Sequence, residues 1–467
     1  MRASRPALLA IVALAAAGLS AAAVPATGAA AISPDLVRLH PTTTHIGAAS
    51  ALPLNTAQCE QRFKIACYGP NQLQRAYDLA PLFAHGNSGK GQTIAVVDSF
   101  GSPTVQHDLD VFDQAYGLPT PKLTVIAPAG KVPAYDGSAT RTGWAGETSL
   151  DVEWAHAMAP GANILLVETP TSEDEGTTGF PEIVTAEKYV VNHHLAAVIS
   201  QSFSATEETF PSQDALLALR SAYQDAYDND VTVLAASGDS GATDATVNGE
   251  LYEHPVTSWP NSDPLVTGVG GTKLSLDANG NRTARDTVWN DSYDVPTQRY
   301  ISGTDGPSAL AGGGGLSTVF DRPTYQVPVA NVVGDQRGVP DVSMSGACNG
   351  AVNVYQSFAG EPAGWYPTCG TSEATPLFAG IVALAAQRAG HPLGLINPAL
   401  YFMAVSHVPG LVDVTSGSNT VSFTQGGKKH TVDGFSAEPG YDLASGVGTV
   451  DAAQFVPELV SYSGHSW

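Results

Sequence analysis

The segment QTIAVVDSF, residues 92–100, is the part of the sequence that decides the fold. Its Ile, Ala and Val residues are consecutive instead of alternating with polar residues, which is typical of a strand that is buried on both faces. Apolar runs of the same kind recur as ANILLVET (162–169), AAVISQSF (196–203) and VTVLAASGDSG (231–241). Such strands belong to parallel sheets that helices cover on both sides.

Helical segments separate these predicted strands. The sequence predicts helices at 149–159, at about 180–194 and within 214–230, and another after Ser372. We therefore expect an α/β fold of three layers, with a central, mostly parallel sheet flanked by helices. Sheets of this kind place their ligand sites at the carboxyl ends of the strands.

The N-terminal residues are typical of a secretory signal peptide. Arg2 and Arg5 precede an apolar stretch at residues 7–19, and small residues follow, which suits cleavage after Ala23 or Ala31. The apolar stretch is shorter than the roughly 18 to 20 residues that a membrane-spanning helix needs. We therefore expect residues 1–31 to be a signal peptide and the protein to be secreted into the extracellular space.

Residues 32–58 are rich in Ala, Thr and Pro and show no sustained helical or strand period. This composition predicts a linker or short leader. No second linker and no internal repeat follow, so we expect residues 59–467 to form one domain and order to begin near Cys59.

Four cysteines in an exported chain predict two disulfides. Local pairing of Cys59 with Cys67 and of Cys348 with Cys369 is the simplest of the three possible connectivities. Free buried thiols are the alternative.

The formal charge of −23, from 44 acidic and 21 basic residues, disfavours nucleic acid and anionic membranes as partners. The acidic excess serves either solubility or adaptation to low pH, and the two are compatible. The sequence GNSGKG at 86–91 lacks the upstream glycine and the Ser/Thr of a phosphate-binding loop, and HExxH zinc motifs are absent from the sequence. We expect a monomer without a nucleic-acid or membrane partner.

Ser372 lies in GTSEATP, residues 370–376, at the start of a predicted helix. Unpaired backbone N–H groups converge at such a position, which suits the stabilisation of an oxyanion. A serine there is equally suited to cap the helix. A nucleophilic role for Ser372 therefore requires a base elsewhere in the chain.

Glu147 and Asp151 are four residues apart and so share one face of a predicted helix. Like charges at this spacing cost a helix a few tenths of a kcal/mol. Two solvated acids on an exposed face are the simple interpretation. If the pair is buried beside Ser372, repulsion and desolvation raise the pKa of at least one carboxyl, which can then accept the hydroxyl proton and return it to the leaving amine.

Asp239 follows a predicted strand into the Gly-flanked turn ASGDSG, residues 236–241. An aspartate in such a turn usually binds its own loop backbone. When protonated, its carboxyl can instead donate a hydrogen bond to a developing oxyanion, and such a mechanism fails as the pH rises.

Taken together, these segments resemble the sedolisins, or serine-carboxyl peptidases, a family with a subtilisin-like fold; the resemblance is to a bacterial-type member with a short leader. The matching segments are ETSLDVE from Glu147, ASGDSG (236–241), SWPNSDPLVTGVGGTKL (258–274), GGGGLSTVFDRPTYQ (312–326), GTSEATPLFAG (370–380), and DVTSG, PGYDLASGVGT and VD between 413 and 451. They occur in the family's order.

The resemblance implies a role for each of four residues. Ser372 would be the nucleophile, Glu147 the general base and acid, and Asp151 its orienting partner. Asp239 would form the oxyanion hole together with the backbone N–H of Ser372. The resemblance also implies endopeptidase action on polypeptides at acidic pH.

One structural Ca²⁺ site near the C-terminus is implied as well. Its ligands would be the carboxylates of Asp413 and Asp442 and the backbone carbonyls of Val414, Glu438 and Gly440. Oxygen-only ligands on a Gly-rich loop suit calcium.

Ser202 and the glycine run at 312–315, in particular Gly313 and Gly314, are predicted to line the substrate cleft, where bare backbone can pair with an extended peptide. A flexible loop is the alternative for the glycine run. The chain departs from well-known family members at Asp98, where they have Glu, and at Ser202-Phe203-Ser204, where they have Ser-Trp-Gly. These differences lie around the predicted catalytic pair.

Three functions therefore compete. The first is a secreted acid endopeptidase with a Ser-Glu-Asp triad. The second is an exopeptidase that releases short peptides from free N-termini. The third is a secreted binding protein on a degenerate peptidase scaffold. An ordinary Ser-His-Asp subtilisin is disfavoured because Asp98 is followed by Ser-Phe and the sequence contains no His-Gly-Thr-His.

Overall fold

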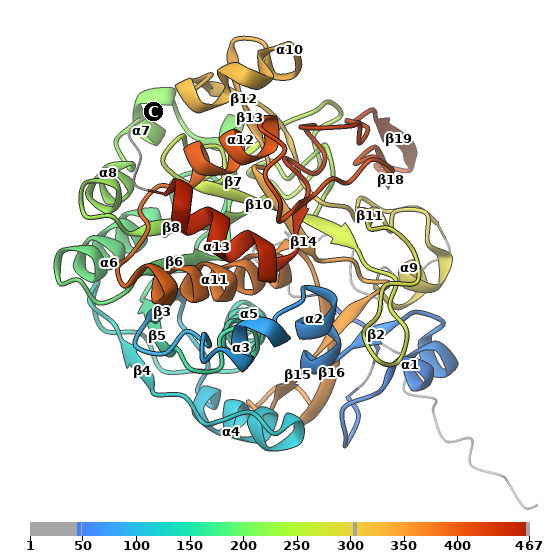
Figure 1. Ribbon diagram of the computed structural model, residues 1–467. Coiled ribbons are helices and arrows are strands. Elements are labelled where there is room, and N and C mark those ends of the chain that lie inside the picture. The colour runs from blue at the N-terminus through green and yellow to red at the C-terminus, as the bar shows by residue number, and fades with distance from the viewer. Residues whose placement is uncertain (1–43, 48, 302–305, 464–467) are drawn as a thin grey trace, which may run out of the picture. The chain divides into compact units, whose positions relative to one another are not determined.

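A sheet of eight strands forms the centre of the computed structural model, which describes residues 44–47, 49–301 and 306–463 (Figure 1). In spatial order the strands are β11 (Thr287–Val288), β10 (Thr267–Lys273), β8 (Thr232–Ala236), β6 (Val198–Gln201), β3 (Thr93–Ser99), β5 (Asn163–Thr169) and β4 (Leu123–Ile126), and β14 (Val342–Ser345) also pairs with β10. All neighbours are parallel except β10 and β11. All described residues belong to the unit Leu36–Trp467. The predicted signal peptide lies outside them.

The consecutive apolar residues of β3 are buried on two different faces. Ile94 and Val96 belong to the hydrophobic cluster that includes side chains of α5 (Ala139–Met158) and α11 (Thr371–Ala389). Ala95 and Val97 belong to a second cluster, with side chains of α6 (Phe180–Asn192) and α8 (Ser221–Asp228). Because successive strand side chains point to opposite faces, the sheet is the middle of three layers. The predicted three-layer α/β fold is confirmed.

Helix α5 begins at Ala139, ten residues before the predicted helix at 149–159. Its first half contains Gly143 and Gly146 and three threonines, which favour a helix weakly by themselves. Burial stabilises it instead: Trp144 is 1% exposed, and every residue from there to Met158 is buried. Tertiary packing therefore extends the helix beyond the sequence pattern.

Helix α11 lies alongside both α5 and α13 (Ala452–Tyr462) (Figure 1). The contact with α5 is close, because a Cβ at Gly380 would lie 2.5 Å from Cβ of Met158. Glycine at this position allows the two helices to approach each other.

A second sheet of four strands carries one cysteine of each of the two disulfides. Its order is β1 (Thr44–His45), β16 (Gly364–Cys369), β15 (Ala351–Gln356) and β2 (Cys67–Tyr68). The predicted bonds Cys59–Cys67 and Cys348–Cys369 are both present.

Regular structure starts earlier than the predicted boundary at Cys59. β1 precedes it, and Cys59 lies inside α1 (Thr56–Phe63). A strand of two residues has no detectable period, and its partner β16 is far away in the sequence. The sequence of residues 32–58, which predicted a linker, therefore gave no signal for β1.

The remaining elements surround these two sheets. The helices are α2 (Pro70–Ala76), α3 (Ala80–Ala84), α4 (Val105–Tyr116), α7 (Gln213–Leu217), α9 (Val295–Ile301), α10 (Ala330–Val333) and α12 (Asn397–Val405), with 3₁₀ turns at Glu207–Thr209 and Thr324–Val329. The paired strands are β7 (Ala205–Thr206) with β9 (Ser258–Trp259), β12 (Gly315–Asp321) with β13 (Gln336–Val339), β17 (Leu411–Val412) with β20 (Thr449–Val450), and β18 (Val421–Gln425) with β19 (Lys428–Val432).

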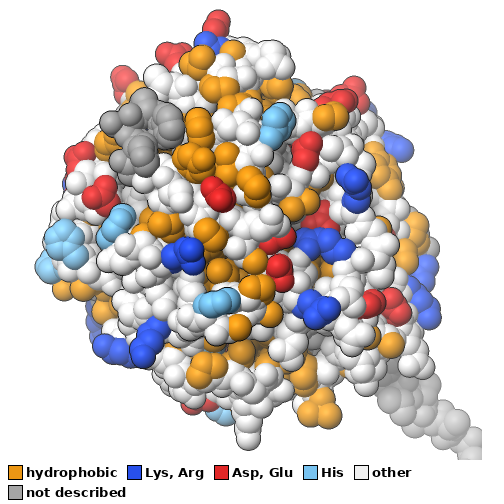
Figure 2. Space-filling view, viewed as in Figure 1, with side chains coloured by type: hydrophobic (Ala, Val, Ile, Leu, Met, Phe, Trp, Pro, Cys, Tyr) orange, Lys and Arg blue, Asp and Glu red, His pale blue; other side chains and the backbone are white. Residues whose placement is uncertain are grey.

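No helix within the described residues is long and apolar enough to span a membrane. On the face shown in Figure 2, acidic and basic side chains are scattered among neutral ones and do not form a single charged patch.

Candidate active site

Ser372 is the second residue of α11, and the cap of that helix is Gly370, with a φ of 133°. Because the cap position is taken by a residue without a side chain, Ser372 does not cap the helix. Its side chain is nearly buried, with the residue 8% exposed. Ser372 Oγ makes one long contact of 3.5 Å to the carbonyl oxygen of Ser202.

Asp239 lies over the turn that precedes Ser372. Its Oδ1 accepts hydrogen bonds from the backbone N–H of Thr371, at 2.7 Å, and from the hydroxyl of Thr371, at 2.8 Å. Its Oδ2 would lie 2.6 Å from a Cβ placed on Gly370. Glycine is therefore required at position 370 for two reasons: the backbone has a positive φ, and the Asp239 carboxylate leaves no room for a Cβ.

Glu147 and Asp151 are both fully buried, one turn apart on α5. The hydroxyl of Ser202, just after the end of β6, donates a 2.9 Å hydrogen bond to Asp151 Oδ1. The same hydroxyl lies 3.4 Å from the carbonyl oxygen of Ser372. Ser202 thus connects the helix that carries the acid pair to the helix that carries Ser372, and the two acids are not the solvated pair of the simple interpretation.

Burial raises the pKa of Asp151 well above its usual value, and the charges of Asp98 and Glu147 raise it further. The hydrogen bond from Ser202 opposes this rise. Burial likewise raises the pKa of Asp98 to about 7, opposed by a hydrogen bond from Thr148 and reinforced by the charge of Glu168. At neutral pH the site therefore contains more carboxyl groups than can be ionised together.

Two further acids interact with these catalytic candidates, Glu168 with Asp98 and Glu373 with Asp239, and sequence reasoning missed both. Glu168 on β5 lies directly beside Asp98 in the sheet register, and burial raises its pKa to about 7. Its position at the carboxyl end of a buried strand was the available signal. Glu373, directly after Ser372, is fully buried, and burial and the charge of Asp239 raise its pKa.

The glycine run at 312–315 is buried and pairs with the protein's own backbone. The N–H of Gly313 donates to Gly238, and its carbonyl accepts from the hydroxyl of Ser237 at 2.9 Å. The carbonyl of Gly314 accepts from Asn419 at 3.2 Å. Close approach explains these glycines, because a Cβ on Gly313 would lie 1.9 Å from the carbonyl oxygen of Ser237. Contact of Gly313, Gly314 or Ser202 with substrate stays a prediction.

The residues predicted to bind calcium lie together in one loop region. Gly440 donates its N–H to Asp413 Oδ2 at 2.9 Å, and Glu438 donates its N–H to Asp442 Oδ2 at 3.1 Å. Val414 is buried, at 1% exposure. Among the described residues, no three or more His, Cys, Asp or Glu side chains are grouped so that they could hold a metal ion, so a cation here would depend on carbonyl oxygens as well as the two carboxylates. This donor set suits Ca²⁺.

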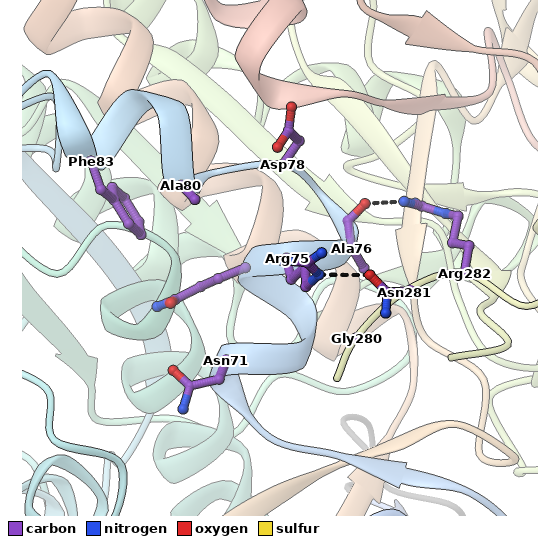
Figure 3. A pocket seen from close by; sticks show the side chains of 10 residues that line it. Asn71, Arg75, Ala76, Asp78, Ala80, Phe83, Gly280, Asn281 and Arg282 are labelled. Atoms are coloured by element: carbon purple, nitrogen blue, oxygen red, sulfur yellow. Dashed lines mark hydrogen bonds between the residues drawn. The ribbon is translucent and has the colours of Figure 1, made fainter. Parts of the chain in front are cut away.

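A surface cavity of about 500 Å³ lies beside α2, away from these residues (Figure 3). Its cationic side chains are already engaged within the protein. Arg75 donates to Asn281 at 2.7 Å, and Arg282 donates to the carbonyl of Ala76 (Figure 3). Arg282 also pairs with Asp286 at 2.8 Å. This cavity therefore offers no chemistry comparable to the carboxyl cluster.

Comparison with known proteins gives consistent matches. Residues 137–426 match the family model described as Subtilase family. The chain is 32% identical to kumamolisin of Bacillus sp. (strain MN-32) over 390 residues, which cover 82% of this chain and 62% of kumamolisin. It is 30% identical to tripeptidyl-peptidase 1 of Macaca fascicularis over 333 residues, 68% of this chain and 52% of that protein.

Among solved structures, Pseudomonas sedolisin, a serine-carboxyl proteinase complexed with two molecules of pseudo-iodotyrostatin, matches with a TM-score of 0.69 and 25% identity. The match covers 85% of this chain and 99% of that one. By contrast, the chain spans only 62% and 52% of the lengths of kumamolisin and tripeptidyl-peptidase 1.

Proposed function

Because the chain belongs to the sedolisin family of serine-carboxyl peptidases, with its subtilisin-like fold, we propose that it is a secreted endopeptidase that hydrolyses polypeptides in acid. The observation that carries this proposal is the position of Ser202, whose hydroxyl bridges the buried Asp151 carboxyl and the backbone of Ser372.

The nucleophile of the proposed reaction is Ser372. Its Oγ attacks the carbonyl carbon of the scissile bond, and Glu147 accepts the hydroxyl proton. Asp151, one helical turn away and held by Ser202, orients Glu147 and shares its proton. Glu147 then returns the proton to the leaving amine. Water repeats the same sequence on the acyl-enzyme and releases the second product.

Asp239 supplies the oxyanion hole in this proposal, with the backbone N–H of Ser372. Both donors from Thr371 act on Oδ1 of Asp239, so a proton on this carboxyl is better placed on Oδ2, the oxygen over Gly370. A protonated Oδ2 can donate to the oxygen that becomes negative in the tetrahedral intermediate.

The proposed activity is confined to acidic pH because Asp239, once ionised, repels the oxyanion. Burial and mutual repulsion raise the pKa of Asp151 and Asp98, so the acid cluster around Asp151 loses its protons only as the pH rises, and this sets the low-pH limit of activity.

A second candidate is an exopeptidase that releases short peptides from N-termini. The similarity to tripeptidyl-peptidase 1 favours it. The two modes use the same four residues and differ only in the products, so one assay can separate them.

We also propose a structural Ca²⁺ ion held by Asp413, Asp442 and the carbonyls of Val414, Glu438 and Gly440. Bound there, the ion would neutralise the two carboxylates and link the loop between β19 and β20 to the segment that follows β17. It takes no part in the chemical step.

The test uses a denatured protein substrate and product analysis by mass spectrometry from about pH 3 to 8. Wild type should cleave internal bonds only in acid, and Ser372→Ala and Glu147→Gln should each lose activity by at least about a thousandfold. Glu187→Gln, which replaces another fully buried glutamate on α6, is the matched control and should keep activity. Products only from N-termini would establish the exopeptidase. A folded, calcium-supplied protein without cleavage at any pH would contradict the peptidase and favour the binding protein.

A further inference from the structure

The turn that carries Asp239 is held in place by a second segment of backbone, which begins at Ala311. The N–H of Ala311 donates to the carbonyl of Asp239 at 2.9 Å, and the N–H of Gly241 donates to the carbonyl of Ala311 at 2.8 Å. Gly313 donates its N–H to the carbonyl of Gly238 at 2.8 Å. The second segment therefore pairs with the turn on both sides of Asp239.

Asn419 joins these two segments just beyond their pairing. It lies in the connection between β17 and β18 and is fully buried. Its backbone carbonyl accepts the N–H of Ala242, directly after the turn, at 2.9 Å. Its side-chain Nδ2 donates to the carbonyl of Gly314, in the second segment, at 3.2 Å. One buried residue thus bonds to both segments.

A further partner fixes the orientation of the Asn419 amide. Its Oδ1 accepts the N–H of Phe435 at 2.7 Å, and its backbone N–H donates to the carbonyl of Phe435 at 3.1 Å. Because the N–H of Phe435 requires an acceptor, the amide oxygen faces Phe435 and the NH₂ group faces Gly314. A Cβ on Gly434 would lie 2.3 Å from Oδ1, so glycine at this position leaves room for the amide.

The chain around Asn419 is fixed by Asn290 and by apolar packing. Asn290 Nδ2 donates to the carbonyls of Ser418 and Thr420, at 2.8 and 2.7 Å. An apolar cluster joins the hairpin of β18 and β19 to the turn and to the second segment; its members are Ala242, Leu251, Ala309, Ala311, Val421, Phe423 and Val432. Because Asn419 is fully buried, water does not replace its bond to Gly314 when that bond is lost.

We propose that Asn419 is a positioning residue for the oxyanion hole, because it holds the Asp239 turn and the glycine run at 312–315 in one fixed arrangement. The proposal rests on the proposed peptidase function. The backbone of Asp239 is held by Ala311, and its carboxyl accepts two hydrogen bonds from Thr371. Displacement of the turn changes the distance from this carboxyl to the oxygen that becomes negative on the substrate.

The expected effect is specific to the tetrahedral intermediate. The donors of an oxyanion hole act on charge that develops only during the reaction, so their displacement lowers kcat and leaves substrate binding nearly unchanged. Asn419 acts through the backbone, since its bonds are to Ala242, Gly314 and Phe435. An asparagine with a structural role alone would lower the stability of the fold without separating kcat from KM.

Steady-state kinetics provide the first test, with calcium present and a peptide that is cleaved internally. Asn419→Ala should lower kcat about twentyfold or more in acid, with KM changed less than about threefold. The matched control is Asn397→Ala, which removes another fully buried asparagine that accepts from Thr267 at 2.6 Å and donates to the carbonyl of Val266 at 2.9 Å. Its kcat should stay within about threefold of wild type. Equal losses of kcat in the two variants would overturn the proposal.

A peptide aldehyde tests the same point without turnover. The Ser372 hydroxyl adds across the aldehyde C=O to give a tetrahedral hemiacetal, whereas the peptide alcohol of the same sequence forms no adduct. Asn419→Ala should weaken binding of the aldehyde about tenfold or more and that of the alcohol less than about twofold. Equal weakening of both ligands would contradict a role in the oxyanion hole.

Asn419→Asp and Asn419→Leu separate the hydrogen bond from the volume of the side chain. Burial keeps the new aspartic acid protonated at about pH 4, so it retains an acceptor for Phe435 and a donor for Gly314. Asn419→Asp should therefore keep kcat within about fivefold of wild type, and Asn419→Leu should lose as much as Asn419→Ala. Equal losses in the aspartate and leucine variants would refute the assigned hydrogen bond.

Hydrogen exchange in a Ser372→Ala background does not depend on activity. The amide of Thr371, which donates to Asp239 Oδ1, should lose protection about tenfold or more on addition of Asn419→Ala, and not on addition of Asn397→Ala. Unchanged protection of this amide would overturn the proposal. Failure of the proposed function would instead appear as a wild-type protein that neither cleaves the peptide nor binds the aldehyde.

Discussion

Ser202 Oγ donates a hydrogen bond of 2.9 Å to Asp151 Oδ1, joining the end of β6 to the middle of α5. This contact orients one member of the buried acid pair and opposes the rise of its pKa. The next residue, Phe203, packs against Trp144 of α5, with ring centroids 6.5 Å apart. The strand end and the helix are thus held together both by a polar and by an aromatic contact.

Ser202→Ala should lower kcat about tenfold or more, because a hydrogen bond to a charged group contributes about 1.5 to 3 kcal/mol. Without this donor the pKa of Asp151 rises further, so the acid limb of the pH profile should move to higher pH. Ser204→Ala replaces a nearby buried serine and is the control. A pH profile of kcat that is the same in both variants would contradict the role assigned to Ser202.

Gly370→Ala should lower kcat at least a hundredfold and the free energy of unfolding by about 1 to 3 kcal/mol. The new methyl group would lie 2.6 Å from Asp239 Oδ2 and would require a φ of 133° from alanine. Gly390→Ala, at the other end of α11, has a φ of 79° with nothing within 4 Å of the new Cβ. This control should cost about 1 kcal/mol without changing kcat. Urea unfolding and steady-state kinetics measure the two effects, and equal kcat losses would disprove the placement of Asp239.

Glu187→Gln should stabilise the protein at neutral pH. Burial raises the pKa of Glu187 from 4.5 to about 8, so the folded state keeps a proton that the unfolded state has lost. This contribution to stability is complete below about pH 4.5 and is lost as the pH rises towards 8. The free energy of unfolding is measured with urea at pH 4.5 and 7.5 in Ser372→Ala and in Ser372→Ala/Glu187→Gln. Its fall between the two pH values should be about 2 to 4 kcal/mol smaller in the double variant. Gln201, which donates to Glu187 Oε1, can bond the new amide oxygen equally well.

Removal of calcium should lower the melting temperature. The expected drop on addition of a chelator is about 5 °C or more, and added Ca²⁺ should reverse it whereas Mg²⁺ should not. Asp413→Asn should remove most of the response, since it takes one carboxylate from the proposed donor set. Differential scanning calorimetry measures this, and an identical Ca²⁺ response in wild type and Asp413→Asn would exclude the assigned site.

The sequence pattern predicted the sheet because a strand buried on both faces has an uninterrupted run of apolar residues. Ile94 to Val97 are apolar without a gap, and the structure divides them between two cores. The start of α5 has no helical sequence pattern of its own. Trp144 and the residues after it form a helix because they are buried against segments distant in the sequence. β1 was missed for the same reason, since two residues pair with a strand far along the chain.

The sequence by itself determined the fold class and the residue types able to carry out the proposed chemistry, because apolar runs and motif order can be read along the chain. It predicted two disulfides but left their pairing open, and the structure decided it. Only the tertiary structure decided that Ser202 bridges Asp151 and Ser372 and that Glu168 lies beside Asp98. Ser202 and Ser372 are 170 residues apart in the chain, and contact at such a separation depends on sheet register and helix packing, which neighbouring residues do not encode.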